Sequence, residues 1–254
     1  MNVYFALIHK DSGSAYGVTF PDLPGCFSAA DAEPLAKKYF GRIPRGPKEA
    51  PDVVTLEVKQ IVEKRMNAEA ETNPQVDIAW HTVPFGHRDS YPLNILAQLL
   101  STRTGRLYKG LVVSSKVATD ASAGVNHRKW AGLFYISGEA KDGHSPEEVE
   151  QAIYAELDKL KQDDLPPEEL QKVKNNFAAY EYRRLSGNMS ILMQLINADG
   201  LGDWREINEA GRKNQAVTAA DVKRVAYQYF TRDNRTVGIY TRKAASSAEP
   251  KKKS

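Results

Sequence analysis

The sequence contains only one cysteine, Cys26, so no disulfide can form within the chain, and a reducing compartment fits this composition. It also lacks any run of roughly 20 apolar residues, the length that a membrane-spanning helix needs, so we expect no membrane partner. The apolar run from Val3 to Ile8 is too short for the core of a signal peptide, and no basic region precedes it. As written, the chain is therefore expected to stay in the cytoplasm.

A large excess of charge of one sign is missing as well, because the formal net charge is only +3 over 254 residues. Such a balance gives no reason to expect a nucleic-acid partner. Part of the surplus belongs to the consecutive lysines Lys251 to Lys253, and we expect residues 244–254 to form a disordered basic tail. The apolar share of 41% and the charged share of 26% are typical of a soluble globular protein with one or two domains.

Closely spaced histidines are also absent, which excludes the usual motifs of zinc hydrolases. A hydrolytic zinc ion needs two imidazoles one helical turn apart, a carboxylate and an open position for water. No two histidines here are three, four or five residues apart, so neither His-Glu-x-x-His nor its inverse occurs. We predict no catalytic residue, no metal ligand and no cofactor in this chain, with a zinc site assembled from distant histidines as the alternative. The histidines are His9, His81, His87, His127 and His144.

The hydrophobic pattern predicts an α+β fold in which an antiparallel or mixed sheet packs against several helices. Two short β-like segments separated by a turn signal predict an N-terminal β-hairpin that ends at Pro21. Strands are expected at residues 3–8, 16–20, 76–80, 117–125, 133–140 and 237–240, with a loosely extended stretch at 53–69. Helices are expected at residues 33–40 and 92–100, from residue 106, and in four segments that begin near residues 145, 166, 204 and 218.

Two of the predicted helices begin with capping residues. Ser145-Pro-Glu-Glu148 predicts a capping box with proline in the first helical position. Thr218-Ala-Ala-Asp221 is predicted to cap the last helix. These signals mark helix N-termini but indicate no chemistry by themselves.

One pair of residues has the chemistry to bind a substrate carbonyl. Arg128 and Tyr135 flank the start of a predicted strand. A guanidinium and a phenol can each donate a hydrogen bond to a carbonyl oxygen and to the oxyanion that forms from it. The alternative, from the residues alone, is a surface arginine and an ordinary strand tyrosine.

A long series of motifs carries a resemblance to one family. In chain order these are Tyr39-Phe-Gly41, Pro74-Gln-Val-Asp-Ile-Ala-Trp80, Asp89, Ser101-Thr-Arg-Thr-Gly-Arg-Leu-Tyr-Lys109, Glu168-Glu-Leu-Gln-Lys-Val-Lys-Asn175 and Val217-Thr-Ala-Ala-Asp-Val222. Through them, residues 33–243 resemble the insulinase-like (pitrilysin-family) zinc metallopeptidases, which are built as two related halves that close on a chamber. Residues 33–72 resemble the end of the first half and the linker, and residues 73–243 resemble the second half.

This resemblance implies a half that does not catalyse hydrolysis alone. In the family the zinc motif lies in the first half, upstream of the matching residues, whereas the second half shapes the chamber. In active relatives the second half also contributes an arginine and a tyrosine seven residues apart to the substrate site, and Arg128 and Tyr135 have that spacing. We therefore expect a domain that binds peptide or completes the chamber of a zinc-bearing partner half.

The first 32 residues carry a separate resemblance. Tyr16-Gly-Val-Thr-Phe-Pro-Asp-Leu-Pro-Gly-Cys-Phe-Ser28 is similar to the start of HicB-type antitoxins, small α+β domains that cover the active site of a toxin. The resemblance implies contact between the hairpin and a HicA-like toxin, although only the first hairpin of such a domain is expected here. A gene fusion, an assembly artefact and a chance likeness are open explanations of the join near Ala30–Glu33. For the whole chain, the alternatives are a toxin-binding module on a carrier domain and a truncated product without activity.

Overall fold

The computed structural model describes residues 7–9, 16–19, 27–30, 41–44, 58–184 and 187–243. The chain divides into two compact units, Met1–Val53 and Val54–Ser254. The predicted helix at residues 33–40, the packing of the hairpin against it and the predicted tail at residues 244–254 all lie outside the described residues.

The first unit contains a three-stranded antiparallel sheet with the strand order β1-β2-β3. The strands are β1 (Leu7–His9), β2 (Tyr16–Thr19) and β3 (Phe27–Ala30). The predicted hairpin corresponds to β1 and β2, but the prediction missed β3, which pairs with β2. The reason is that Phe27-Ser-Ala-Ala30 holds only one strong strand former, so its extended conformation depends on pairing.

The second unit is built on a mixed five-stranded sheet with the order β4-β8-β5-β7-β6. β4 pairs with β8 in parallel, and every other pair in this sheet is antiparallel. The strands are β4 (Lys64–Ala70), β5 (Gln75–Thr82), β6 (Ala118–His127), β7 (Gly132–Ala140) and β8 (Arg235–Arg242). The predicted mixed sheet is therefore confirmed, with its first and last strands side by side.

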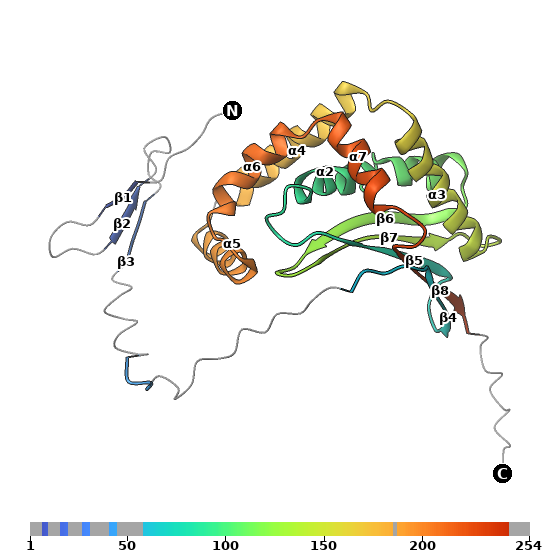
Figure 1. Ribbon diagram of the computed structural model, residues 1–254, viewed down its shortest axis with the longest axis horizontal. Coiled ribbons are helices and arrows are strands. Elements are labelled where there is room, and N and C mark those ends of the chain that lie inside the picture. The colour runs from blue at the N-terminus through green and yellow to red at the C-terminus, as the bar shows by residue number, and fades with distance from the viewer. Residues whose placement is uncertain are drawn as a thin grey trace, which may run out of the picture. The chain divides into compact units, whose positions relative to one another are not determined.

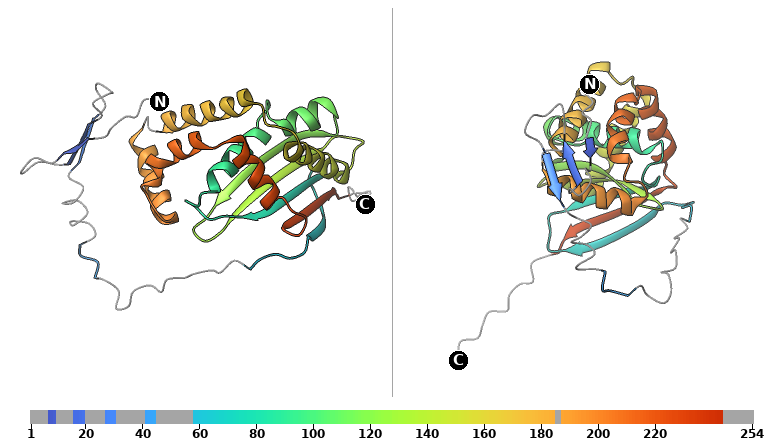
Figure 2. Two further views of the ribbon diagram at one scale, coloured as in Figure 1. Left: turned by 45° about the horizontal axis from the view of Figure 1, so that its top comes forward. Right: turned by 90° about the vertical axis from the view of Figure 1, so that its left-hand side faces the viewer.

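Helices lie on one face of this sheet, and no described element of this unit covers the opposite face, which is termed the open face (Figures 1 and 2). The helices are α2 (Ser90–Leu100), η1 (Tyr108–Ser114), α3 (Pro146–Gln162), α4 (Pro167–Arg184), α5 (Asn188–Leu201), α6 (Glu206–Ala216) and α7 (Ala219–Tyr229). The helix predicted from residue 106 is wider than expected: η1 is a π-helix, closed by a 2.9 Å hydrogen bond from Ser115 N–H to the Gly110 carbonyl.

The two predicted caps have different outcomes. The Thr218 hydroxyl accepts from Asp221 N–H and the Asp221 carboxylate accepts from Thr218 N–H, which is a complete capping box. Ser145 also accepts from the amide of Glu148, at 3.3 Å. The Glu148 carboxylate, however, lies 2.5 Å from the His144 ring, so the reciprocal bond of the predicted box is replaced by a histidine contact.

Helix α5 was not predicted: five α-helices follow residue 145 in the described residues, and the sequence pattern indicated four. The segment is apolar on several sides, so it lacks the one-sided spacing of apolar residues by which an amphipathic helix is recognised.

The core lies between the sheet and the helices. Val76, Ile78 and Trp80 alternate with more exposed residues along β5, which confirms the predicted one-sided strand. Trp80 and Phe134 both contact Phe230, with ring centroids 4.9 and 4.8 Å apart, so the chain just after α7 is packed onto the sheet. Truncating one such ring is expected to cost about 3–5 kcal/mol of unfolding free energy.

Strand β4, at one edge of the sheet, is attached to the helix layer by an ion pair whose carboxylate is buried. Both Arg65 terminal nitrogens donate to Glu150 on α3, at 2.8 and 2.7 Å, and the Tyr154 hydroxyl donates to the same carboxylate at 2.6 Å. The Glu150 side chain is only 2% exposed. Burial acts to raise the pKa of Glu150, but the hydrogen bonds from Arg65 and Tyr154 outweigh it, so the pKa lies below its ordinary value.

Candidate functional site

The predicted site residue Tyr135 lies on the open face of the sheet. Its strand partners in the register are Ala79 on β5 and Gly124 on β6, so a small residue stands on each side of the phenol. The Tyr135 side chain is 45% exposed and leans over Gly124. A β-carbon on Gly124 would lie only 2.3 Å from the Tyr135 hydroxyl oxygen, so glycine is what allows the ring to occupy this position.

Adding a methyl group to Gly124 is therefore expected to displace the phenol. Gly124→Ala should move the Tyr135 ring by about 1 Å, the shift needed to restore ordinary van der Waals contact. Because the ring lies on the exposed face, the melting temperature should change little. NMR of tyrosine-labelled protein should show a shifted Tyr135 resonance, with Gly211→Ala, a position with open space around it, as the control. An unmoved Tyr135 resonance would contradict this placement of the ring.

Arg128 opens the turn between β6 and β7, on the same hairpin as Tyr135. Its amide donates to the Ala131 carbonyl and its carbonyl accepts from the Phe85 amide, both at 2.9 Å, while its side chain is exposed. It lies four positions after Gly124, the strand partner of Tyr135, which is about 13 Å along the strand. The structure thus places both predicted residues at one end of one hairpin, with no hydrogen bond between them among the described residues.

The turn that carries Arg128 is anchored by the residue before it. The His127 ring nitrogen Nδ1 lies 3.1 Å from the Val83 carbonyl oxygen, in the loop after β5. Burial lowers the pKa of His127 below its ordinary value, against the opposing effect of its hydrogen bonds to backbone carbonyls. His127 is therefore neutral at pH 7, and its bond to Val83, together with that between Phe85 and Arg128, fixes the end of the hairpin.

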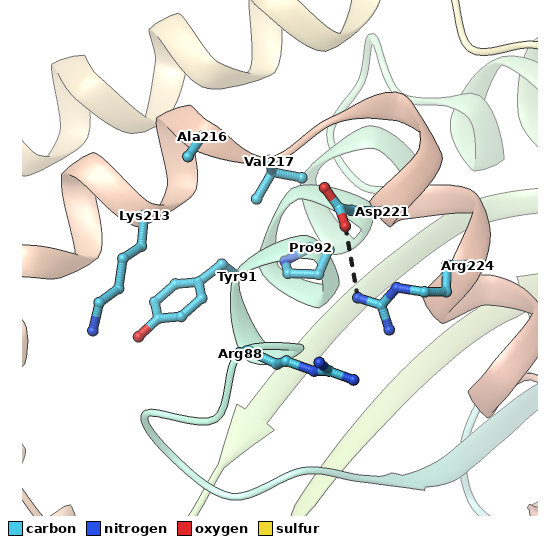
Figure 3. A pocket seen from close by; sticks show the side chains of 8 residues that line it. All are labelled: Arg88, Tyr91, Pro92, Lys213, Ala216, Val217, Asp221 and Arg224. Atoms are coloured by element: carbon cyan, nitrogen blue, oxygen red, sulfur yellow. Dashed lines mark ion pairs between the residues drawn. The ribbon is translucent and has the colours of Figure 1, made fainter.

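The helix side of the unit holds a separate cavity of about 370 Å³ (Figure 3). Its cations are Arg88, Lys213 and Arg224, and each of them lies within 4 Å of a carboxylate, Arg88 at 3.7 Å from Asp89. Lys213 bonds Glu206 at 2.9 Å and Glu209 at 2.8 Å, and Arg224 lies 2.8 Å from Asp89 and 3.8 Å from Asp221. Arg224 thus joins α7 to the start of α2, and Lys213 is paired within α6. Because these cations are paired, the cavity does not present the net positive charge that would favour an anionic ligand.

Asp89 is the buried centre of this linkage. The Tyr229 hydroxyl donates to it at 2.7 Å, and Arg224 donates to its other oxygen. Burial acts to raise the pKa of Asp89, but these two hydrogen bonds outweigh it, and the pKa is lowered from its ordinary value. The likeness of this arrangement to Glu150 with Arg65 and Tyr154 is evident: each joins two elements through one carboxylate, one arginine and one tyrosine.

Acid is expected to weaken the link through Asp89. Because its pKa is lower in the folded chain, its stabilising contribution is complete above the unfolded value of about 4 and is lost as the pH falls through the folded value. Urea unfolding at pH 7 and pH 3 should therefore show that acid lowers the free energy of unfolding less in Asp89→Asn than in the wild type. The exposed Asp158→Asn change should leave the pH dependence unaltered. Equal acid losses in Asp89→Asn and wild type would refute this assignment.

The described residues do not fit a catalytic zinc ion. Among them, no three histidine, cysteine, aspartate or glutamate side chains lie close enough together to hold a metal.

None of the helices in the part of the chain that the structure describes has the length and apolar run needed to cross a membrane.

Comparison with known proteins agrees with the fold. The sequence model of the family described as the peptidase M16 inactive domain matches residues 24–177, more than half of the chain. The chain belongs to this family. The predicted resemblance to the second, non-zinc half of insulinase-like metallopeptidases is thereby confirmed. None of the curated proteins compared with the chain matches it.

Solved structures similar to this M16 inactive domain include longer chains and chains of nearly the matched length. A protease from Helicobacter pylori has a TM-score of 0.77 at 21% identity, covering 82% of this chain and 51% of its own. A peptidase M16 inactive domain from Pseudomonas fluorescens has a TM-score of 0.70 at 17% identity, with coverages of 85% and 51%. An inactive peptidase domain from Bordetella parapertussis has a TM-score of 0.63 at 25% identity, with coverages of 69% and 96%. The chain thus spans about half the length of the Helicobacter pylori protease.

The N-terminal residues are similar to a different family. A model of the HicB-like antitoxin of bacterial toxin–antitoxin systems matches residues 4–40, so it extends beyond the predicted end at residue 32. It overlaps the M16 match over residues 24–40. The HicA-like toxin partner stays a prediction.

Sequence reasoning missed the parts of the site that depend on register and burial. It found Arg128 and Tyr135 but not Gly124, whose missing side chain makes room for the phenol. A glycine inside a strand pattern was the available signal, since it often marks a close approach. Asp89 was noted only as part of a family motif, and nothing in the sequence linked it to Arg224, 135 residues away.

Proposed function

We propose that this M16 inactive domain completes the peptide-binding chamber of a zinc-bearing peptidase half, with its open sheet face turned to the peptide. Support comes from membership of the family and from coverage of about half of the Helicobacter pylori protease. In this proposal the domain binds and orients peptide, and the chain hydrolyses none by itself.

The observation that carries the proposal is the placement of two hydrogen-bond donors on one hairpin of the open face. Arg128 is exposed at the turn, and Tyr135 is half exposed on the adjacent strand with small neighbours on both sides. The small neighbours leave room for a peptide to approach the phenol. A peptide carbonyl lying between the two side chains would accept from both, and an oxyanion would accept more strongly than a neutral carbonyl.

A peptide titration tests binding by this face without a partner half. Isotope-labelled domain would be titrated with a short unstructured peptide and followed by amide chemical shifts. Shifts are expected at Ala79, Gly124 and Ser137, which share the open face, and Arg128→Ala or Tyr135→Phe should weaken binding. Shifts confined to the helix side, or none at millimolar peptide, would exclude peptide binding by the open face.

The antitoxin-like alternative rests on the N-terminal match and on the three-stranded sheet of the first unit. It predicts capture of a small basic ribonuclease by residues 1–53. Capture that survives deletion of residues 1–53 would argue against it.

A further inference from the structure

Helix α5 carries apolar side chains on the face that does not pack. Met189, Leu192, Met193 and Ile196 are 69%, 48%, 49% and 55% exposed, and these four residues are termed the α5 seam. The buried residues of the helix are instead Gln194 and Ala198. An exposed apolar stripe of this kind is unusual on the surface of a soluble domain and marks a site of association.

The orientation of α5 is fixed by a polar anchor on its buried side. The Gln194 amide donates to the Arg184 carbonyl at 2.9 Å and to the Ser190 carbonyl at 3.1 Å. At 100° per residue, Gln194 and Ala198 lie on the side of the helix opposite the α5 seam. The bond to Ser190 lies within α5, but the bond to Arg184 joins the helix to the end of α4. Turning the helix to bury the seam would break the Gln194–Arg184 bond, so the exposure of the seam belongs to the fold.

The spacing of the α5 seam suits another helix. Its members lie at positions i, i+3, i+4 and i+7, the pattern by which one helix packs its side chains between those of a second. Tyr180 on α4 and Trp204 in the turn between α5 and α6 are also exposed, each with an arginine within 5.4 Å of its ring. Methionine, tyrosine, tryptophan and arginine are the residues enriched where proteins meet.

We propose that the α5 seam packs antiparallel against the α5 seam of a second copy of this chain. A twofold axis between Leu192 and Met193 would pair Met189 of one copy with Ile196 of the other, and Leu192 with Met193. Such a self-complementary contact is what a twofold dimer requires. This proposal does not depend on the proposed peptide-binding function, which uses the open face of the sheet.

Charge favours a second copy in this antiparallel arrangement. Asp199 is the only charged residue of α5, so no like charges meet along the seam. In the antiparallel register Asp199 lies opposite the N-terminal end of the other α5, whose N-cap residue is Gly187. No side chain caps that end, so its first amide groups and the positive end of its helix dipole can accept a carboxylate. A parallel pair would instead set Asp199 against Asp199.

Sedimentation equilibrium of the full chain over a range of concentrations tests the proposal. A monomer–dimer equilibrium is expected, and Ile196→Asp should raise the dissociation constant at least tenfold. Tyr227→Asp is the matched control, because Tyr227 on α7 is also 55% exposed and should leave the constant unchanged. Circular dichroism would establish that both variants are folded.

A paired substitution tests the register. Because Met189 is placed against Ile196 of the other copy, Met189→Lys combined with Ile196→Asp should restore dimerisation by forming two intermolecular ion pairs. A chain that stays monomeric at the highest concentration, a dimer indifferent to Ile196→Asp, or a double variant that fails to recover would each overturn the proposal. Occupation of the seam by peptide or by another protein, without self-association, would overturn it as well.

Discussion

Replacing Arg128 by alanine is expected to lower the turnover of this domain mixed with a zinc-bearing half by about 100- to 1,000-fold, the usual cost of removing one oxyanion donor. The arginine is exposed at the turn of the β6–β7 hairpin, and its side chain forms no hydrogen bond or ion pair with the described residues. Its loss should therefore leave stability unchanged. If Arg128 acts on charge that develops during reaction, kcat falls while KM changes little.

The adjacent Lys129 gives a matched control for this experiment. It is a cation on the same turn, lying 4.7 Å from the centre of the Trp130 ring. Lys129→Ala removes one positive charge from nearly the same place, so it reports the part of any loss that comes from general electrostatic attraction. Equal losses of turnover in Lys129→Ala and Arg128→Ala, or an increase in KM without a fall in kcat, would contradict a specific role of Arg128.

Removing the carboxylate of Glu150 is expected to lower the free energy of unfolding by about 1.5–3 kcal/mol, because its hydrogen bonds to Arg65 and Tyr154 are lost and only the exposed contact of Arg65 with Glu63 is kept. Glu150→Ala deletes three hydrogen bonds at once, two from Arg65 and one from Tyr154. Since Arg65 lies on β4 and Glu150 on α3, the change also releases the edge strand from the helix layer. Urea unfolding measures the loss, and amide exchange should accelerate most in β4.

An exposed carboxylate on the same helix is the control for this effect. Asp158 is 62% exposed and lies 3.8 Å from Lys161, a surface contact that contributes at most about 1 kcal/mol. Asp158→Ala should therefore leave the unfolding midpoint nearly unchanged. A small effect of Glu150→Ala, comparable to that of Asp158→Ala, would mean that β4 is held by strand pairing alone.

Local pattern was sufficient to predict the elements whose burial is periodic. The one-sided strand around Trp80 and the capped helix after Thr218 were found in this way, because each has a single buried face or an explicit end signal. Helix α5 was missed because its apolar residues are not confined to its buried side. Strand β3 was missed because its conformation is imposed by β2.

The candidate site, too, could be predicted only in part from local sequence. Residue type and family resemblance indicated Arg128 and Tyr135, since guanidinium and phenol groups are recognisable in any sequence. Strand register then decides which residues stand beside the phenol, and register is a property of distant pairings such as Ala79 with Tyr135. The ion pairs of Asp89 and Glu150 likewise span 135 and 85 residues, beyond the reach of any local pattern.

The order of strands in the sheet has a consequence for synthesis of the chain. β8, the last strand to leave the ribosome, lies between β4 and β5, which are the first two strands of this unit to emerge. Until residues 235–242 are free, β4 has no neighbour in the sheet and one edge of β5 is unpaired. Completion of the sheet must therefore await the synthesis of β8, and a nascent chain stalled before β8 leaves the two strand edges that β8 covers open to chaperones and to aggregation.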